Sequence, residues 1–184
     1  MDDADHPPGK TGPQLPIEVD EQTGVWTTDG LPMLYVPRHF FINNHLAVEA
    51  ALGQANYAKY LYPAGYKSAY YWCGQESNTH GLEGLAVFEH YLARLSKRGW
   101  GLFQFVEASS TTGQACIMLQ HSCFVLQNPE RQGKLCYMFA GWFAGAMDWV
   151  IETTRPGSPV KTTCEETQCA SEGAGHCLFT VSAK

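Results

Sequence analysis

The feature that most constrains this chain is a stretch near its C-terminal end, residues 164–177, which reads CEETQCASEGAGHC. It holds three cysteines, three glutamates and a histidine, and a further cysteine, Cys136, opens the apolar segment before it. Thiolate, carboxylate and imidazole groups are the side chains that hold zinc, and Gly173 and Gly175 let a short loop curl back on itself. The stretch predicts a fold held together by a metal ion more clearly than it predicts an activity.

The spacing lets Cys169 and Cys177 converge on one ion, provided that strand ends bracket the loop between them. Cys136 would then supply a ligand from the opposite side. Glu166 is one residue out of alternation with Cys169, so the strand must turn there for both side chains to point inward. Chemistry alone does not rank Glu166 above Glu165. Two other interpretations stay open: the cysteines pack as small apolar residues, or they form a disulfide, which a reducing cytosol disfavours.

The composition of the 184 residues indicates a single well-packed globular domain. The formal charge is −6 and the 12 Lys and Arg residues form no cluster, which argues against a nucleic-acid surface. No segment approaches the roughly 18 apolar residues of a membrane span, and the N-terminus lacks the apolar core of a secretion signal. Seven cysteines is an odd number, consistent with reduced thiols, so we expect a soluble cytoplasmic protein. The cysteines expected in the core are Cys73, Cys116 and Cys123.

The first part of the chain has the periodicity of helices. We predict a disordered, proline-rich tail over residues 1–16 and one domain over residues 17–184, with a hairpin and helices at 17–98 and a sheet and zinc loop at 99–184. The hairpin turns at Glu21–Gly24, and a short extended piece, 34–36, precedes Pro37. Helices are predicted over residues 40–52, 55–72 and 84–95, the second of them broken in two at Pro63–Gly65.

From Trp100 the hydrophobic period changes to that of strands. We predict strands over residues 102–107 and 114–126 and a final hairpin of 160–167 with 178–181 around the cysteine loop. Between them, residues 136–151 form a helix that is apolar on nearly every side, with Asp148 as its one charge. Such a helix should be buried on most sides.

The run Cys136-Tyr-Met-Phe-Ala-Gly141-Trp-Phe-Ala-Gly145, followed by Glu166-x-x-Cys169 and Cys177, resembles the 4-vinyl reductase domain. That domain also forms the aromatic-sensing N-terminal region of phenol- and xylene-responsive transcription activators, where the matching residues bind one zinc. The resemblance implies that the zinc ligands are Cys136, Glu166, Cys169 and Cys177. It covers residues 80–184, with an insertion at 155–161. Residues 16–100 look more like a group of stand-alone relatives, some associated with catabolism of N-methylated amines.

The resemblance also implies a fold and a partner. The fold is α/β (α+β), an antiparallel sheet with helices packed on it that encloses a small-molecule pocket, usually in a homodimer. The sensors continue into an ATPase and a DNA-binding domain, whereas this sequence stops at Lys184, so we do not expect it to activate transcription in that way.

Pockets of this kind are mostly apolar with a few polar anchors. A histidine would suit a phenol, and a cage of tyrosine and tryptophan would suit a methylated amine through cation–π attraction. The side chains that we predict to contact the ligand are His80, Tyr91, Phe103, His121 and Trp142.

Three functions remain open from the sequence. The first is a zinc-containing small-molecule-binding domain, which four protein ligands favour because they leave no position for water on the metal. The second is a zinc-dependent enzyme, or an accessory subunit, in reductive or demethylating small-molecule catabolism. No nucleophile or cofactor motif supports it, and catalytic residues cannot be assigned. The third is an assembly scaffold.

Overall fold

The computed structural model describes residues 10–184, and the chain divides into two compact units, Met1–Val36 and Pro37–Lys184. Of the disordered tail predicted over residues 1–16, residues 1–9 lie outside the described part. None of the helices within residues 10–184 is both long and apolar enough to cross a membrane.

The first unit is a small antiparallel sheet of β1 (Ile17–Val19), β2 (Trp26–Thr28) and β3 (Leu31–Met33), in that order. Ile17 pairs with Thr28, which confirms the predicted hairpin around Glu21–Gly24. The third strand comes earlier than the extended piece predicted before Pro37. The reason is Asp29-Gly30, whose φ angles of 53° and 75° make the two-residue turn that Asp-Gly sequences favour.

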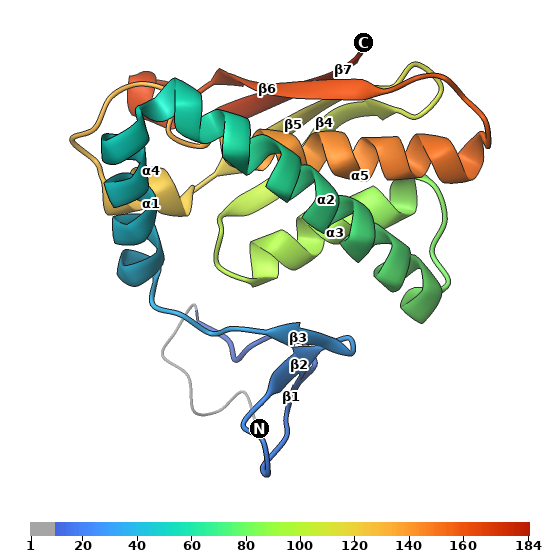
Figure 1. Cartoon of the computed structure of the whole chain (residues 1–184), viewed down its shortest axis with the longest axis horizontal. Coiled ribbons are helices and arrows are strands. Elements are labelled where there is room, and N and C mark those ends of the chain that lie inside the picture. Colours follow the sequence, from blue (N-terminus) through green and yellow to red (C-terminus); the bar gives the residue numbers. More distant parts are fainter. Residues whose placement is uncertain (1–9) are drawn as a thin grey trace. The chain divides into compact units, whose positions relative to one another are not determined.

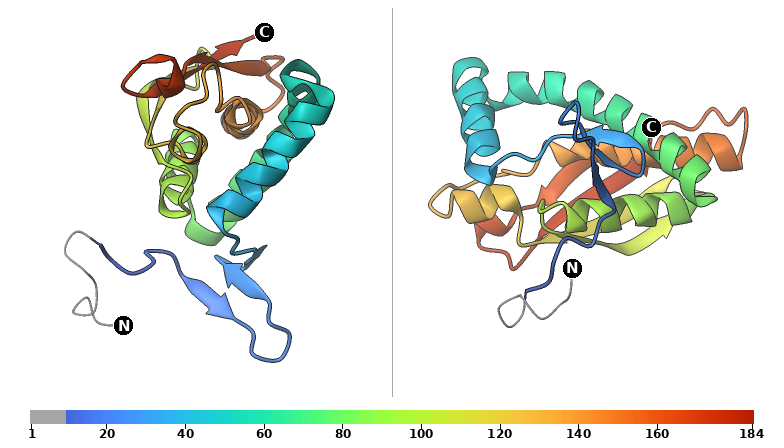
Figure 2. Two further views of the ribbon diagram at one scale, coloured as in Figure 1. Left: turned by 90° about the vertical axis from the view of Figure 1, so that its left-hand side faces the viewer. Right: turned by 90° about the horizontal axis from the view of Figure 1, so that it is seen from below.

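The second unit contains a four-stranded sheet and the helices. Its helices are α1 (Arg38–Leu52), α2 (Gln54–His80), α3 (Leu85–Lys97), α4 (Cys123–Gln127), α5 (Phe139–Thr154) and the short 3-10 helix η2 (Ala170–Glu172). Its strands are β4 (Leu102–Ser109), β5 (Gln114–Gln120), β6 (Thr162–Gln168) and β7 (Cys177–Ala183). The sheet is antiparallel in the order β4-β5-β7-β6, and the helices lie on one of its faces (Figures 1 and 2). The predicted α+β fold, an antiparallel sheet with helices packed on it, is confirmed.

Helix α5 is the centre of the core. It lies beneath the sheet and is flanked by α2 and α3 (Figures 1 and 2), and every residue from Phe143 to Ile151 is buried. Its one aspartate, Asp148, is also buried and accepts hydrogen bonds from the Tyr66 hydroxyl at 2.7 Å and from the Thr162 N–H and hydroxyl at 2.7 and 2.8 Å. The burial predicted from the apolar pattern is therefore confirmed, and the charge joins α5 to α2 and β6.

Helix α2 runs unbroken from Gln54 to His80, so the predicted break at Pro63–Gly65 is wrong. Proline removes one backbone hydrogen bond and disfavours a helix interior. The helix continues because α5 packs closely along it. Gly141 and Gly145 of α5 lie so near the backbone carbonyls of Tyr62 and Tyr66 that a Cβ on either glycine would clash. This packing outweighs the local preference of the sequence.

The strand predicted over residues 114–126 is also wrong beyond Gln120. His121 has a φ of 54°, which ends the strand, and Ser122 accepts the N–H of Phe124 at 3.3 Å as the N-cap of α4. A serine before a short apolar run is a known helix start, and here it outweighs the alternating pattern.

Candidate metal centre

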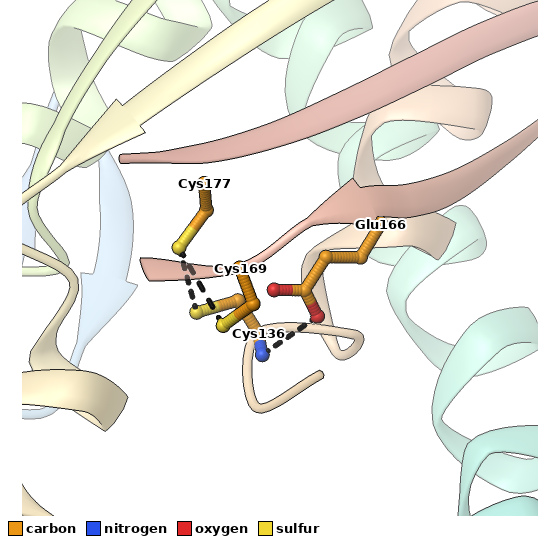
Figure 3. Close-up of side chains that lie close together, drawn as sticks. All are labelled: Cys136, Glu166, Cys169 and Cys177. Atoms are coloured by element: carbon orange, nitrogen blue, oxygen red, sulfur yellow. Dashed lines mark hydrogen bonds between the residues drawn. The ribbon is translucent and has the colours of Figure 1, made fainter. Parts of the chain in front are cut away.

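Four side chains converge at one end of the sheet (Figure 3): Cys136, Glu166, Cys169 and Cys177 are all buried, and one donor atom of each lies within 4.8 Å of the others. The Sγ atom of Cys177 is 3.7 Å from that of Cys136 and 3.8 Å from that of Cys169. Tetrahedral zinc with Zn–S bonds of about 2.3 Å places its sulfur ligands about 3.8 Å apart. Both of these sulfur pairs therefore already have the separation that one ion requires.

Strand ends place these donors. Cys177 begins β7, Glu166 lies near the end of β6, Cys169 directly follows β6, and Cys136 comes shortly before α5. The pairing of β6 with β7 shifts register between Glu166 and Gln168. This irregularity is the turn that the alternation argument required, and it lets the Glu166 and Cys169 side chains reach the same point.

The metal-free cluster cannot hold all its acidic groups as anions. Hydrogen bonds from Cys136 and Cys177 hold the pKa of Cys169 far below its ordinary value. Hydrogen bonds to Cys169 and Cys177, together with burial, raise the pKa of Cys136. Burial and then the neighbouring Cys169 raise the pKa of Glu166 to about 9. Cys169 is thus the sulfur most readily deprotonated, and a bound cation would favour deprotonation of the others.

The carboxylate of Glu166 also fits a metal ligand. Its Oε2 accepts the backbone N–H of Cys136 at 2.9 Å, whereas Oε1 is buried and has no hydrogen-bond partner within residues 10–184. A buried polar atom without a partner is costly, and a metal ion would supply one. Three sulfurs and one carboxylate oxygen are a donor set that zinc accepts.

Several polar side chains that the sequence did not predict support the donors. Ser122 Oγ lies 2.9 Å from the sulfur of Cys136, and Ser171 Oγ donates to the sulfur of Cys169 at 3.1 Å. Lys134 donates to the backbone at the end of β6 at 2.6 Å and to a carboxylate of η2 at 2.9 Å. Such outer contacts orient metal ligands. Most join residues far apart in the chain, so no local sequence pattern marks them.

A second buried network attaches the centre to α1. The Tyr137 hydroxyl, next in sequence to Cys136, donates to Glu49 at 2.7 Å and lies 3.3 Å from Nε2 of His45. Arg131 also pairs with Glu49. Burial lowers the pKa of His45, which favours its neutral form. The loop that carries Cys136 is therefore tied to two residues of α1.

Of the residues predicted to contact a ligand, Tyr91, Phe103 and Trp142 belong to one aromatic network in the interior. The ring centroids of Tyr91 and Trp142 are 6.4 Å apart, and Phe139 lies 5.2 Å from both Phe103 and Trp142. The other two lie elsewhere: His80 is at the end of α2 beside Glu76, and His121 is exposed in the turn after β5.

An open groove of about 510 Å³ is bounded by residues of α2 and α5. Its lining is rich in aromatic rings, contains one carboxylate and two lysines, and includes none of the five predicted ligand residues. The lining residues are Tyr66, Lys67, Tyr70, Tyr71, Gly74, Gln75, Asn78, Trp149, Glu152 and Lys161.

Comparison with known proteins gives one match to a sequence family. Residues 11–106 match the model of the family described as "Domain of unknown function (DUF5943)". No curated protein matches the sequence.

The fold is shared with solved structures of low sequence identity. The phenol-responsive sensory domain of the transcription activator PoxR, with phenol, matches with a TM-score of 0.73 at 11% identity, over 91% of this chain and 84% of that one. A vinyl-4-reductase family protein from Methanocaldococcus jannaschii matches with a TM-score of 0.52 at 14% identity, over 83% and 84%. A trafficking protein particle complex subunit 3 from Naegleria fowleri, covalently bound to palmitic acid, matches with a TM-score of 0.55 at 14% identity, over 79% and 92%. The predicted resemblance to 4-vinyl reductase and aromatic-sensing domains is confirmed at the level of fold.

Proposed function

The chain belongs to the family described as a domain of unknown function (DUF5943), and from this premise we propose that it is a zinc-containing domain that binds a small molecule. The observation that carries the proposal is the convergence of Cys136, Glu166, Cys169 and Cys177. Four protein donors leave no position open for water, which is the arrangement of structural zinc. The likeness in fold to a domain crystallised with phenol supports the binding of a small molecule.

Zinc would act here as a cross-link. Bound to all four donors, it would join the β6–β7 end of the sheet to the segment that leads into α5. Because α5 is the centre of the core, this cross-link would fix the helix against the sheet and stabilise the groove between α2 and α5.

The ligand class that we propose is an aromatic or small hydrophobic compound or a methylated amine. The groove between α2 and α5 has a volume within the roughly 300–1,000 Å³ of ligand sites. Rings of Tyr66, Tyr70 and Trp149 line it, and such rings suit both flat aromatic compounds and quaternary ammonium groups. A second location is the aromatic interior at Tyr91, Phe103 and Trp142, three of the five residues predicted to contact the ligand.

The first test is native mass spectrometry of untagged protein, purified without an affinity-metal step. We expect one zinc per chain, and a homodimer at the oligomer mass. A chain that folds with no bound metal, in growth medium containing zinc, would contradict the metal assignment. Any co-purified compound would appear as an additional mass and identify the ligand class.

The second test is a thermal-shift screen of phenols and methylated amines. We expect a member of one class to raise the melting temperature by several degrees, because a ligand that binds only the folded state stabilises it. The side chain of Tyr71 lines the groove and is largely exposed, so Tyr71→Ala should weaken ligand binding at least fivefold. Tyr60 is similarly exposed on α2 but lies outside the groove, so Tyr60→Ala should leave the affinity unchanged. Loss of binding in Trp142→Phe alone would instead place the ligand in the interior. No response from either class would overturn the phenol and methylated-amine assignments.

A further inference from the structure

A second group of metal-binding side chains lies between α2 and α3, built from elements that contribute nothing to the cysteine cluster. Glu76 and His80 are four residues apart on α2, so they share one face of the helix, and His90 comes from α3. One donor atom of each lies within 4.8 Å of the others. Nε2 of His90 is 2.8 Å and Nε2 of His80 is 3.3 Å from the same carboxylate oxygen, Oε2 of Glu76.

The carboxylate of this group is fully buried, whereas its two imidazoles are partly exposed. Glu76 is 0% exposed, and its other oxygen, Oε1, has no hydrogen-bond partner in the described part of the chain. The side chains of His80 and His90 are 31% and 22% exposed. A carboxylate this deeply buried is costly unless positive charge or hydrogen bonds compensate it. The exposed histidine side gives an ion in solution a path to that carboxylate.

The separations fit coordination of one ion. Metal–ligand bonds of about 2.1 Å place neighbouring donors about 3.0 Å apart in octahedral and about 3.4 Å apart in tetrahedral geometry. The two measured separations, 2.8 and 3.3 Å, need little change to reach either value. The ring of His90 is held in place by stacking on Trp72, with centroids 5.7 Å apart and planes 22° apart.

We propose that Glu76, His80 and His90 form a second metal site, for a first-row divalent transition metal such as Zn²⁺, Ni²⁺, Co²⁺ or Fe²⁺. Two imidazoles and one carboxylate are donors that these ions share. Three protein ligands leave coordination positions open, so the ion would keep exchangeable water, unlike an ion held by the four donors of the cysteine cluster.

Arg94 is the competitor for this site. Its Nε is 3.3 Å from Nε2 of His90 and 3.9 Å from Oε2 of Glu76, so the guanidinium balances the buried carboxylate when no metal is bound. A metal ion must displace it or bind against its repulsion. A substitution of Arg94 therefore distinguishes the two interpretations of this group. Removing the guanidinium should strengthen metal binding if the group is a metal site, and should only destabilise the group if it is an ion-pair network.

The test is calorimetric titration of Ni²⁺ into the untagged full chain with its zinc in place, while a colorimetric chelator reports any zinc displaced from the cysteines. We expect one saturable Ni²⁺ site that releases no zinc. His80→Ala and His90→Ala should weaken binding at least tenfold, and Arg94→Met should strengthen it at least fivefold. His39→Gln, on the exposed surface of α1, is the matched control and should leave the affinity unchanged.

Two results would overturn the site: no saturable binding in either the unaltered chain or Arg94→Met, or full binding in the His80→Ala, His90→Ala double variant. Circular dichroism checks that each variant is folded. If His90→Ala does not fold, because the stacking of His90 on Trp72 is lost, His80→Ala at the end of α2 still tests the site. The zinc count at the cysteines is measured in the same samples, so failure here is distinguishable from failure of the proposed function.

Discussion

Cys136→Ser is expected to remove the bound zinc and to lower the free energy of unfolding by about 3–5 kcal/mol. For a domain of this size that corresponds to a fall in melting temperature of about 10 °C. The reason is that Cys136 is the one donor outside the β6–β7 hairpin and is completely buried. Without its thiolate, the metal no longer links the sheet to α5.

The measurement is thermal unfolding followed by circular dichroism, with zinc counted by native mass spectrometry. Cys116→Ser is the matched control: this cysteine is half-buried on β5 outside the cluster, so zinc should stay at one per chain and the melting temperature should change by only a few degrees. Zinc retained in a folded Cys136→Ser protein would contradict the ligand assignment. A stable protein that loses a measurable turnover would favour the enzyme hypothesis.

Gly145→Ala is expected to cost about 3 kcal/mol or more of unfolding free energy, although alanine is the better helix former. A Cβ at this position would clash with the backbone carbonyl of Tyr66, and a backbone atom cannot move aside as a flexible side chain can. The two helices would have to separate, and the contact between α2 and α5 is what keeps α2 helical through Pro63. Loss of that contact should therefore also reduce the helical signal.

The comparison is Gly74→Ala, a glycine of α2 whose Cβ would lie 3.4 Å from the Trp149 ring, an ordinary contact. That change should be neutral or stabilise by up to about 1 kcal/mol through helix propensity. Urea denaturation at pH 7 measures both variants. Equal stability of Gly145→Ala and the unaltered chain would show that α2 and α5 are less closely packed than the structure indicates.

Much of the fold could be predicted because its signals are local. The apolar run that became α5 and the cysteine spacing around β6 and β7 each depend on residues near one another in sequence. The errors arose where a distant contact or a single capping residue decides the structure. Pro63 stays helical because of glycines about eighty positions later, and Ser122 starts α4 within an alternating pattern.

The candidate sites follow the same rule. The spacing in the sequence predicts that Cys169 and Cys177 lie close together. The residues alone do not distinguish Glu166 from Glu165, because that choice depends on the register of β6 with β7, which only the strand pairing defines. The Glu76–His80 pair had a local signal in its four-residue spacing. Its partner His90 lies across a helix–helix contact that no periodicity reveals.

The position of β7 has a consequence for how the chain is made. It follows both α5 and β6 in chain order, yet it lies inside the sheet between β5 and β6 and carries Cys177 (Figure 1). As the polypeptide leaves the ribosome, α5 and its apolar surface therefore emerge before the sheet that covers them can close. Chains in that interval expose both an unpaired strand edge and an unburied helix, the features that favour aggregation. The yield of folded protein should then depend on how soon β7 follows α5 out of the ribosome and on chaperones that shield α5 until then.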